Sequence, residues 1–256
     1  MKNKITAENI SYAFDISSTK VFQDLSFEIP GGNIFSIIGM NGSGKTTILK
    51  TLLGYYPPTE GKIIFQQDEK YYQLSETRGL IGYLPQNEQV PLRMNANDYI
   101  SLGRMPFLSI FGMPVMDEPK IILGVIRDLG ITELRFTPLG EMSGGELQRV
   151  RLARALIQEP KIILFDEPTT HLDISNKKAI FSMMEKLRRK EKIIVFSSNE
   201  PNEALKYSDF TLIVDNNSNY IFGRTKKVIT SRSINKFFKV KSEITKIHGE
   251  DIIYYL

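Results

Sequence analysis

Short apolar runs bounded by turn residues dominate the pattern of hydrophobic and polar positions along the chain. Three of them are Ile34 to Ile38, Ile162 to Phe165 and Ile193 to Phe196, with Ser36 as the one polar interruption. Uninterrupted apolar runs of this length are typical of strands buried on both faces of a parallel sheet. The pattern therefore predicts an α/β fold with a mostly parallel central sheet.

The N-terminal part has a different pattern, in which apolar and polar residues alternate. Strands are expected at Ile5 to Phe14 and Val21 to Ile29, joined by a turn over residues 15–20. Alternation is typical of antiparallel strands with one exposed face, so this part predicts an antiparallel β subdomain. Further strands are expected at residues 61–65 and 80–84, followed by a hairpin of residues 211–214 and 220–222.

Helical spacing replaces the strand pattern after Pro91. Asn95 or Asn97 can cap a first helix, Pro119 is suited to the first turn of a second, and Ser143 opens a third that runs to Ile157. These helices predict an α-helical subdomain inserted between two strand regions. A later helix, opened by Ser175, carries apolar residues at helical spacing.

The chain is expected to form one domain over residues 1–256. Residues 1–90 and 158–222 would form the core with its β subdomain, and residues 91–157 the helical insertion. Residues 223–256 form a C-terminal tail to which the sequence assigns no role.

Composition limits the possible class and location of the protein but does not indicate a function. With 256 residues, 41% of them hydrophobic, the chain can bury a substantial core, and without cysteine it has no disulfide or thiolate metal site. No apolar run approaches the roughly 18 residues of a membrane span. The net charge of +4 suits an anionic surface or an ordinary solvated one, and a cytoplasmic location is expected.

The clearest chemical motif lies between the first buried strand and a helix. Residues 39–46 follow the pattern of glycine, four residues, then Gly-Lys-Thr. The motif contributes Gly39, Asn41, Gly42, Ser43, Gly44, Lys45 and Thr46, and Thr47 follows in the helix. Glycines let backbone N–H groups surround a polyphosphate, Lys45 adds positive charge, and the Thr46 hydroxyl can bind Mg²⁺. The alternative is a glycine-rich turn with an exposed lysine.

A second glycine pair begins the last helix of the insertion, in Ser143-Gly144-Gly145-Glu146. Ser143 and Glu146 have the spacing of a capping box, which by itself would explain both. Capping does not require two glycines. Their presence leaves the helix N-terminus open to close approach, which indicates a second anion site.

Acidic and polar residues follow the buried strands. Asp166 and Glu167 come directly after Phe165, and Gln86 follows the strand that ends at Leu84. Ligands bind where parallel strands end, so these side chains are candidates for a site beside the phosphate loop, although solvated strand ends are the ordinary alternative. Phe14 precedes the loop's strand and could stack on a base or pack in the core.

With the phosphate loop, Ser-Gly-Gly-Glu and the Asp166-Glu167 strand in this order, nearly the whole chain resembles an ATP-binding cassette (ABC) ATPase. The resemblance implies a P-loop, RecA-like core that binds ATP and Mg²⁺. It also implies that Asp166 holds Mg²⁺ through water and that Glu167 is the general base. Gln86 would sense the metal, and Phe14 would stack on adenine.

Two other motifs of the family carry over. Met142 to Glu146 matches the signature motif, which contacts the γ-phosphate bound by the other subunit of a dimer. Thr170-His171-Leu172-Asp173 matches the loop that crosses the dimer interface. The sequence departs from the family at Glu146, where glutamine is commoner, and at Asn199, which stands where a switch histidine is usual. Asn199 puts fast hydrolysis in doubt.

A finer resemblance lies in Ile100 to Phe107, whose Gly-Arg-x-Pro segment is similar to ATPase subunits of importers for ferric siderophores, haem and cobalamin. It implies a homodimer at the inner face of the membrane that powers uptake through a permease, with a substrate-binding protein acting indirectly. The permease would contact residues Gln86 to about Met116, and Arg104→Glu is expected to uncouple transport while largely sparing basal hydrolysis. A soluble ATP-driven clamp on ribosomes or DNA is one alternative; an ATP-binding switch with little hydrolysis is another. A single phosphate loop and no sustained heptads argue against the clamp, so nucleic acid is an improbable partner.

Overall fold

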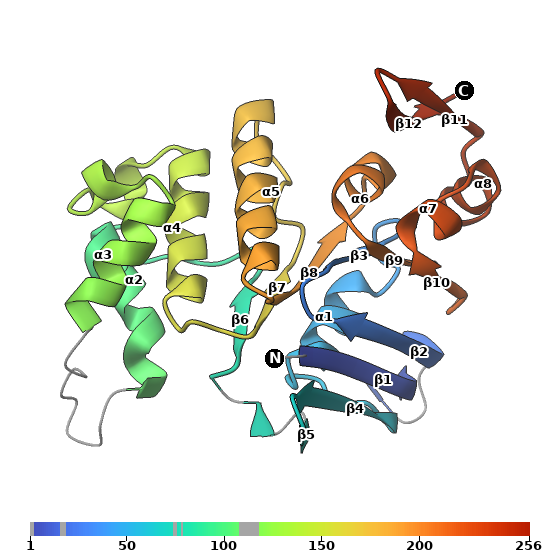
Figure 1. Ribbon diagram of the computed structural model, residues 1–256, viewed down its shortest axis with the longest axis horizontal. Helices are drawn as coiled ribbons and strands as arrows, with labels where there is room; N and C mark the ends of the chain where they lie inside the picture. The colour runs from blue at the N-terminus through green and yellow to red at the C-terminus, as the bar shows by residue number, and fades with distance from the viewer. Residues whose placement is uncertain (1–2, 16–18, 74–75, 78, 108–117) are drawn as a thin grey trace.

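A six-stranded sheet forms the centre of the protein in the computed structural model, which describes residues 3–15, 19–73, 76–77, 79–107 and 118–256. Its strand order is β10-β9-β3-β8-β7-β6, parallel except for the edge strand β10. The strands are β3 (Ile34–Ile38), β6 (Ile81–Leu84), β7 (Ile162–Phe165), β8 (Ile193–Ser198), β9 (Phe210–Val214) and β10 (Tyr220–Arg224). The predicted α/β class with a mostly parallel sheet is confirmed (Figure 1).

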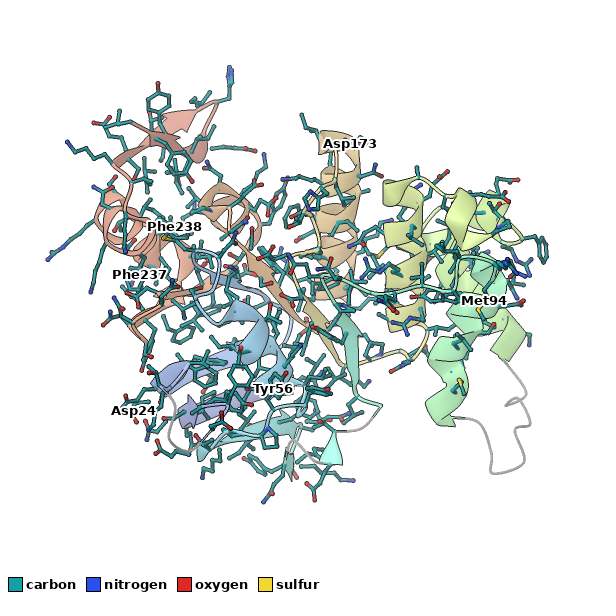
Figure 2. The ribbon with its side chains drawn as sticks, turned by 180° about the vertical axis from the view of Figure 1, so that it is seen from behind. Asp24, Tyr56, Met94, Asp173, Phe237 and Phe238 are labelled. Carbon is teal, nitrogen blue, oxygen red and sulfur yellow. The ribbon has the colours of Figure 1, made fainter. Side chains whose placement is uncertain are left out.

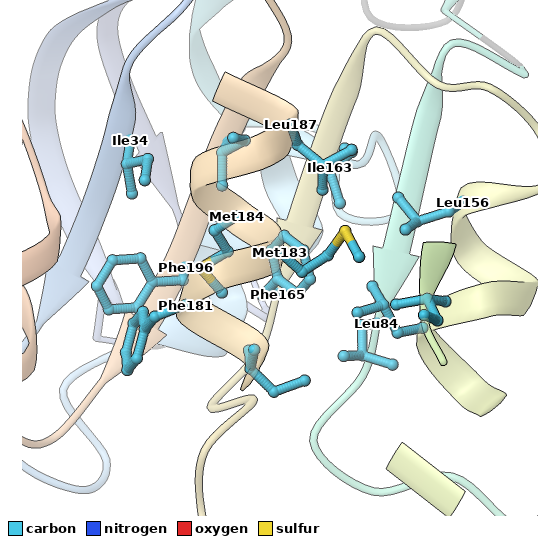
Figure 3. Close-up of a cluster of buried hydrophobic side chains, with 14 of the residues drawn as sticks. Ile34, Leu84, Leu156, Ile163, Phe165, Phe181, Met183, Met184, Leu187 and Phe196 are labelled. Carbon is cyan, nitrogen blue, oxygen red and sulfur yellow. The ribbon is translucent and has the colours of Figure 1, made fainter. Parts of the chain in front are cut away.

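Both faces of this sheet are buried, which explains the continuous apolar runs. Along β7, Ile163 and Phe165 join one hydrophobic cluster, whereas Ile162 and Leu164 join the other. Helix α5 (Ile174–Arg189) covers the first face, and its Met183 lies over the sheet close to Ile163 and Phe165 (Figure 3). The helix begins after Asp173, whose carboxylate accepts the Asn176 N–H at 2.8 Å, so the expectation that Ser175 opens it was wrong.

An antiparallel sheet of order β2-β1-β4-β5 lies on the second side of the core. Its strands are β1 (Asn3–Tyr12), β2 (Phe22–Pro30), β4 (Glu60–Gln67) and β5 (Lys70–Gln73). The sequence did not predict β5, because its largely polar residues carry no alternating pattern. Helix α1 (Lys45–Leu52) packs Ile48, Leu49 and Leu52 into the cluster that the two sheets share.

The helical insertion follows β6 and precedes β7, and Figure 1 shows it to one side of the central sheet. It contains α2 (Ala96–Ser101), η2 (Leu102–Phe107), α3 (Glu118–Asp128), η3 (Thr132–Leu134), η4 (Leu139–Glu141) and α4 (Gly144–Leu156). Asn95 caps α2 by accepting the Asp98 N–H at 2.9 Å, so of the two candidate caps the first is the one used.

The C-terminal tail folds against the core. It forms α7 (Thr225–Val228), α8 (Ser231–Phe238) and a hairpin of β11 (Ser242–Ile247) and β12 (Glu250–Tyr255). The hairpin contacts α6 (Pro201–Tyr207), where the Asn202 amide exchanges two hydrogen bonds with the backbone of Ile253. From α8, Phe237 is buried in the core (Figure 2). Within the described part of the chain, no helix has both the length and the apolar character needed to cross a membrane.

Candidate nucleotide site

The loop of residues 39–44 owes its shape to glycine. A Cβ on Gly39 would lie 2.4 Å from the Val214 carbonyl oxygen and 2.5 Å from Ser43 Oγ, so no larger residue fits. Gly42 and Gly44 have φ angles of 81° and 89°, in the left-handed region that glycine adopts readily. Helix α1 begins directly afterwards, and no described side chain caps it. Its first backbone N–H groups therefore face the loop, with Thr47 in the same turn.

Lys45 lies at the mouth of this loop with only 5% of its surface exposed. Its Nζ donates to the carbonyl oxygens of Gly39 and Met40 at 3.0 and 3.2 Å, and it lies 3.4 Å from Glu167 Oε1. The ammonium group, held at the loop by two carbonyl oxygens and one carboxylate, is a positive donor that can bind a phosphate oxygen. The alternative of an exposed lysine on a turn does not apply.

Asp166 follows β7 and is surrounded by hydroxyl groups. Its Oδ1 accepts hydrogen bonds from Thr46 Oγ1 at 3.1 Å and from Ser197 Oγ at 2.7 Å, and its Oδ2 accepts one from the Tyr83 hydroxyl at 3.4 Å. Burial and the nearby negative charge of Asp166 raise the pKa of Tyr83, so the phenol stays protonated and remains a donor. Asp166 is therefore held as a buried, oriented acceptor.

Glu167, the next residue, is oriented by a separate set of groups. Its Oε2 accepts hydrogen bonds from Gln86 Nε2 at 2.7 Å and from Thr170 Oγ1 at 3.3 Å. Its backbone N–H donates to Ser197 Oγ at 2.8 Å, and its φ of 45° is in the left-handed region, which is unusual for a residue with a side chain. Gln86 and Glu167, both expected at the site, thus meet beside Lys45.

These groups are suited to a polyphosphate with a divalent cation. Ser43 Oγ is buried and, among the described residues, lacks a hydrogen-bond partner, and it lies inside the loop that presents the α1 N–H groups. Mg²⁺ is commonly bound by one or two protein oxygens together with phosphate and water. Thr46 and Asp166 supply such a pair, since the Thr46 hydroxyl donates to Asp166 and keeps lone pairs for a metal.

Phe14 lies at the edge of an aromatic cluster. Its ring is 60% exposed and makes edge contacts with Tyr12 and Tyr56, at centroid distances of 5.3 and 5.6 Å. Tyr12 and Tyr56 stack on each other at 5.3 Å, and Tyr56 comes shortly after α1 (Figure 2). The cluster presents Phe14 to solvent near the end of that helix, rather than packing it in the core.

The glycine pair at the start of α4 has two different explanations. Ser143 and Glu146 form the predicted capping box, in which hydrogen bonds from Ser143 lower the pKa of Glu146. A Cβ on Gly145 would lie 2.3 Å from the Asn176 side chain, so Gly145 allows α4 to pack against α5. Gly144 has open space around its Cβ position and leaves the helix N-terminus accessible. Figure 1 shows α5 between α4 and α1, so the helix that Ser143 caps lies apart from the helix that follows the phosphate loop.

Asp173 and Asn199, the other expected site residues, are both exposed. Asp173 caps α5, and hydrogen bonds to its carboxylate, first of all from the Asn176 backbone, lower its pKa (Figure 2). Asn199 directly follows β8, two residues after Ser197. Because β8 pairs with β7, Asn199 follows a strand whose end borders the Asp166 region.

The loop that contains Gln86, called the Gln86 loop below, follows β6 and is connected to the helical insertion through Glu88. This carboxylate accepts hydrogen bonds from Tyr99 at 2.8 Å and Arg151 at 3.2 Å, and it lies 2.6 Å from Arg154. Arg151 also donates to the Pro85 carbonyl oxygen at 2.6 Å. These contacts connect the Gln86 loop directly to α2 and α4.

Arg104 has a structural role that the sequence did not reveal. It is 9% exposed and donates to the Ile157 carbonyl oxygen at 3.3 Å, at the end of α4. Its burial argues against a direct contact with a permease, while the expectation that Arg104→Glu uncouples transport stays a prediction. Met105, its neighbour, is 60% exposed. Residues 108–116 of the expected permease surface lie outside the described residues.

Sequence reasoning missed Tyr83 and Glu88 as members of the site and its surroundings, and it considered Ser197 only as a substitute for the switch histidine, not as a partner of both acids. Ser197 could have been noticed as a polar residue at the carboxyl end of a buried strand, the same signal that identified Asp166. Tyr83 required the knowledge that β6 lies beside β7. Glu88 required the position of α4, which no local pattern provides.

Comparison with known proteins agrees with this geometry. Residues 22–170 match the family model described as ABC transporter. The chain is 30% identical to the molybdate import ATP-binding protein MolC of Haemophilus influenzae, over 93% of this chain and 89% of that protein. It is 28% identical to the iron(3+)-hydroxamate import ATP-binding protein FhuC of Bacillus subtilis, over 94% and 90%. A solved metal-chelate type ABC transporter in an inward-facing conformation matches with a TM-score of 0.86 at 27% identity, over 99% of this chain and 97% of that one.

Proposed function

Because the chain belongs to the ABC transporter family, we propose that it is the ATP-hydrolysing subunit of an importer for a metal chelate. The observation that carries the proposal is the meeting of Lys45, Thr46 and the two acids Asp166 and Glu167 around one glycine loop. These groups follow β3 and β7, parallel strands on either side of β8, so the ends of the strands converge on one site.

The binding roles follow from the contacts. Lys45 and the N–H groups of α1 would bind the outer phosphates of ATP, and the exposed ring of Phe14 would stack on the adenine. Thr46 and Asp166 would hold Mg²⁺, with Gln86 near enough to Glu167 to respond to it. When bound, Mg²⁺ neutralises charge on the phosphate oxygens.

Glu167 would act as the general base. Hydrogen bonds from Gln86 and Thr170 both reach its Oε2, which fixes the direction of the carboxylate. A carboxylate oriented in this way can accept a proton from a water molecule as that water attacks the γ-phosphate. Asn199, which follows β8, would orient the same water more weakly than a histidine, because it supplies only an amide donor.

A second copy of the chain would complete the site. Helix α5 separates α4 from the helix that follows the phosphate loop, so Ser143 and the accessible N-terminus of α4 are available to a γ-phosphate bound by a partner. Beside Asp173, Ile174 is 87% exposed, an unusual position for a large apolar side chain. These features support a homodimer that encloses two ATP molecules.

The cargo class is inferred from the relatives. A relative named for iron(3+)-hydroxamate import and a structure of metal-chelate type favour a ferric siderophore, with haem and cobalamin as related chelates. The relative named for molybdate import makes an oxyanion the competing cargo. The subunit would lie at the cytoplasmic face of the membrane and contact a permease through the Gln86 loop, Met105 and their surroundings.

The test combines uptake and hydrolysis. Uptake of labelled ferric hydroxamate, haem, cobalamin and molybdate is measured in native cells and in the same cells lacking the gene. The cells lacking the gene are then complemented with the parent or with Glu167→Gln. We expect loss of chelate uptake that only the parent restores, together with ATP turnover by the purified parent. Normal uptake of all four cargoes, or co-purification with nucleic acid in place of a membrane permease, would contradict the proposal.

A further inference from the structure

We propose that Ser197 is a positioning residue that holds both acids of the site, Asp166 through its carboxylate and Glu167 through its backbone, and thereby sets Mg²⁺ affinity and turnover. The inference rests on the proposed ATPase function. It concerns a residue outside the phosphate loop and outside the Asp166-Glu167 pair, on a strand that otherwise contributes only apolar packing to the same face.

A single hydroxyl makes both contacts. Ser197 Oγ donates to Asp166 Oδ1 at 2.7 Å and accepts the Glu167 N–H at 2.8 Å. Ser197 is 0% exposed and Asp166 is 2% exposed, so water does not compete for these bonds. The hydroxyl has one proton to donate and lone pairs to accept with, and the two bonds use it in both ways.

Strand register places Ser197 beside Asp166 and Glu167. Phe165 pairs with Phe196, and the residues that follow, Asp166 and Ser197, therefore continue side by side beyond the paired strands. Along β8, Ile193 and Val195 face the same cluster as α1, and by alternation Ser197 faces the same way, toward the phosphate loop. On its other edge, β8 pairs with β3, and Ser197 lies opposite Ile37. Strand β3 ends directly before that loop.

The second bond stabilises an unfavourable backbone conformation. Glu167 has a φ of 45°, which costs free energy for a residue with a side chain, and such conformations persist only where surrounding contacts impose them. The Ser197 bond fixes the peptide that precedes this φ angle, so it helps to aim the Glu167 side chain at Gln86 and Thr170. Removing the hydroxyl would loosen both acids at once.

The experiment compares Ser197→Ala with a matched control, Ser36→Ala. Ser36 is also 0% exposed and lies in the middle of the adjacent strand β3, where it bonds to Thr211 and Ser208 on the β9 side, away from the acids. Both variants lose a buried hydroxyl, so thermal melting measures the structural cost that they share. Ser197→Thr keeps the hydroxyl and tests for rescue.

Two readouts separate positioning from a structural effect. Binding of a fluorescent ATP analogue is titrated with Mg²⁺ and again in EDTA, and steady-state turnover gives kcat and KM. We expect Ser197→Ala to need about 10- to 100-fold more Mg²⁺ and to lose a similar factor in kcat, the range typical for partners of a metal ligand. Binding in EDTA should stay at the parental value, and Ser197→Thr should recover most of the loss.

Other results would overturn the role. Parental Mg²⁺ dependence and kcat in Ser197→Ala would show that Thr46 and Tyr83 hold Asp166 without help. Equal losses in Ser197→Ala and Ser36→Ala would show a general loss of folding. Failure of the parent itself to bind the ATP analogue would instead remove the proposed function, which is a distinguishable outcome.

Discussion

The nucleotide site and the C-terminal hairpin are both held by polar contacts, yet they use them differently. At the site, the ends of β3, β7 and β8 bring buried groups together, and Asp166 alone accepts three hydroxyl hydrogen bonds. The hairpin packs Ile253 into the main cluster, and its polar contacts are the Asn202 amide and the exposed pair of Lys206 and Glu250. The difference indicates that the site's contacts orient reacting groups on a sheet already stabilised by its core, whereas the hairpin's contacts secure a segment.

The most complete loss of function is expected for Lys45→Ala, because every later step requires bound ATP. The substitution removes the buried ammonium group at the mouth of the loop, so ATP binding should be lost, by about 100-fold or more in affinity. Calorimetric titration with Mg-ATP measures it. The control is Lys50→Ala in the same helix, where Nζ lies over the Tyr56 ring, outside the loop. Unchanged affinity in Lys45→Ala would remove the assigned phosphate site.

Glu167→Gln should separate binding from hydrolysis. An amide cannot accept the proton of the attacking water, so turnover should fall by about 1000-fold while ATP stays bound and the dimer accumulates. Turnover and size-exclusion chromatography with Mg-ATP measure the two effects, and Glu191→Gln, which changes an exposed acid, is the control. Hydrolysis at the parental rate would mean that another group is the base.

The parts of the molecule that could be predicted from the sequence are those whose structure depends on local patterns. The strands β3, β7 and β8 were predictable because burial on both faces leaves continuous apolar runs, and the phosphate loop because its glycines are needed locally, as Gly39 shows. The position of Asp166 and Glu167 could be predicted because these two residues directly follow such a strand.

Residues whose role depends on packing between distant segments could not be predicted. Arg104 is drawn inward because η2 packs tightly on α4, where a Cβ on Gly103 would lie 2.4 Å from the Arg154 carbonyl oxygen. The tail has no motif, and its place depends on the contact of Asn202 with Ile253, 51 positions away along the chain. Neither relation leaves a periodic signal in the sequence.

Asn199→His is expected to raise turnover. If Asn199 orients the water weakly, a histidine at this exposed position supplies a stronger donor, and one positioned contact in the transition state is typically worth on the order of 100-fold. ATP affinity should change little. The control is Asn216→His, in the exposed turn between β9 and β10. Brisk parental hydrolysis that the histidine does not improve would show that another group already orients the water.

Asn202→Ala should have the smallest effect and should appear in stability rather than in chemistry. The amide donates to the Ile253 carbonyl oxygen at 3.1 Å and accepts the Ile253 N–H at 2.8 Å, so alanine leaves two backbone groups without these partners. The expected loss is about 1–2 kcal/mol in the free energy of unfolding. Thermal melting measures it, and Lys206→Ala, which breaks the exposed pair with Glu250, should lower the melting temperature less. Since Asn202 lies three residues after Asn199, the same variant also tests the separation of the two regions. Parental kcat in a less stable protein would show that the hairpin contributes only stability, whereas a fall in kcat without a change in melting temperature would make the hairpin part of the site.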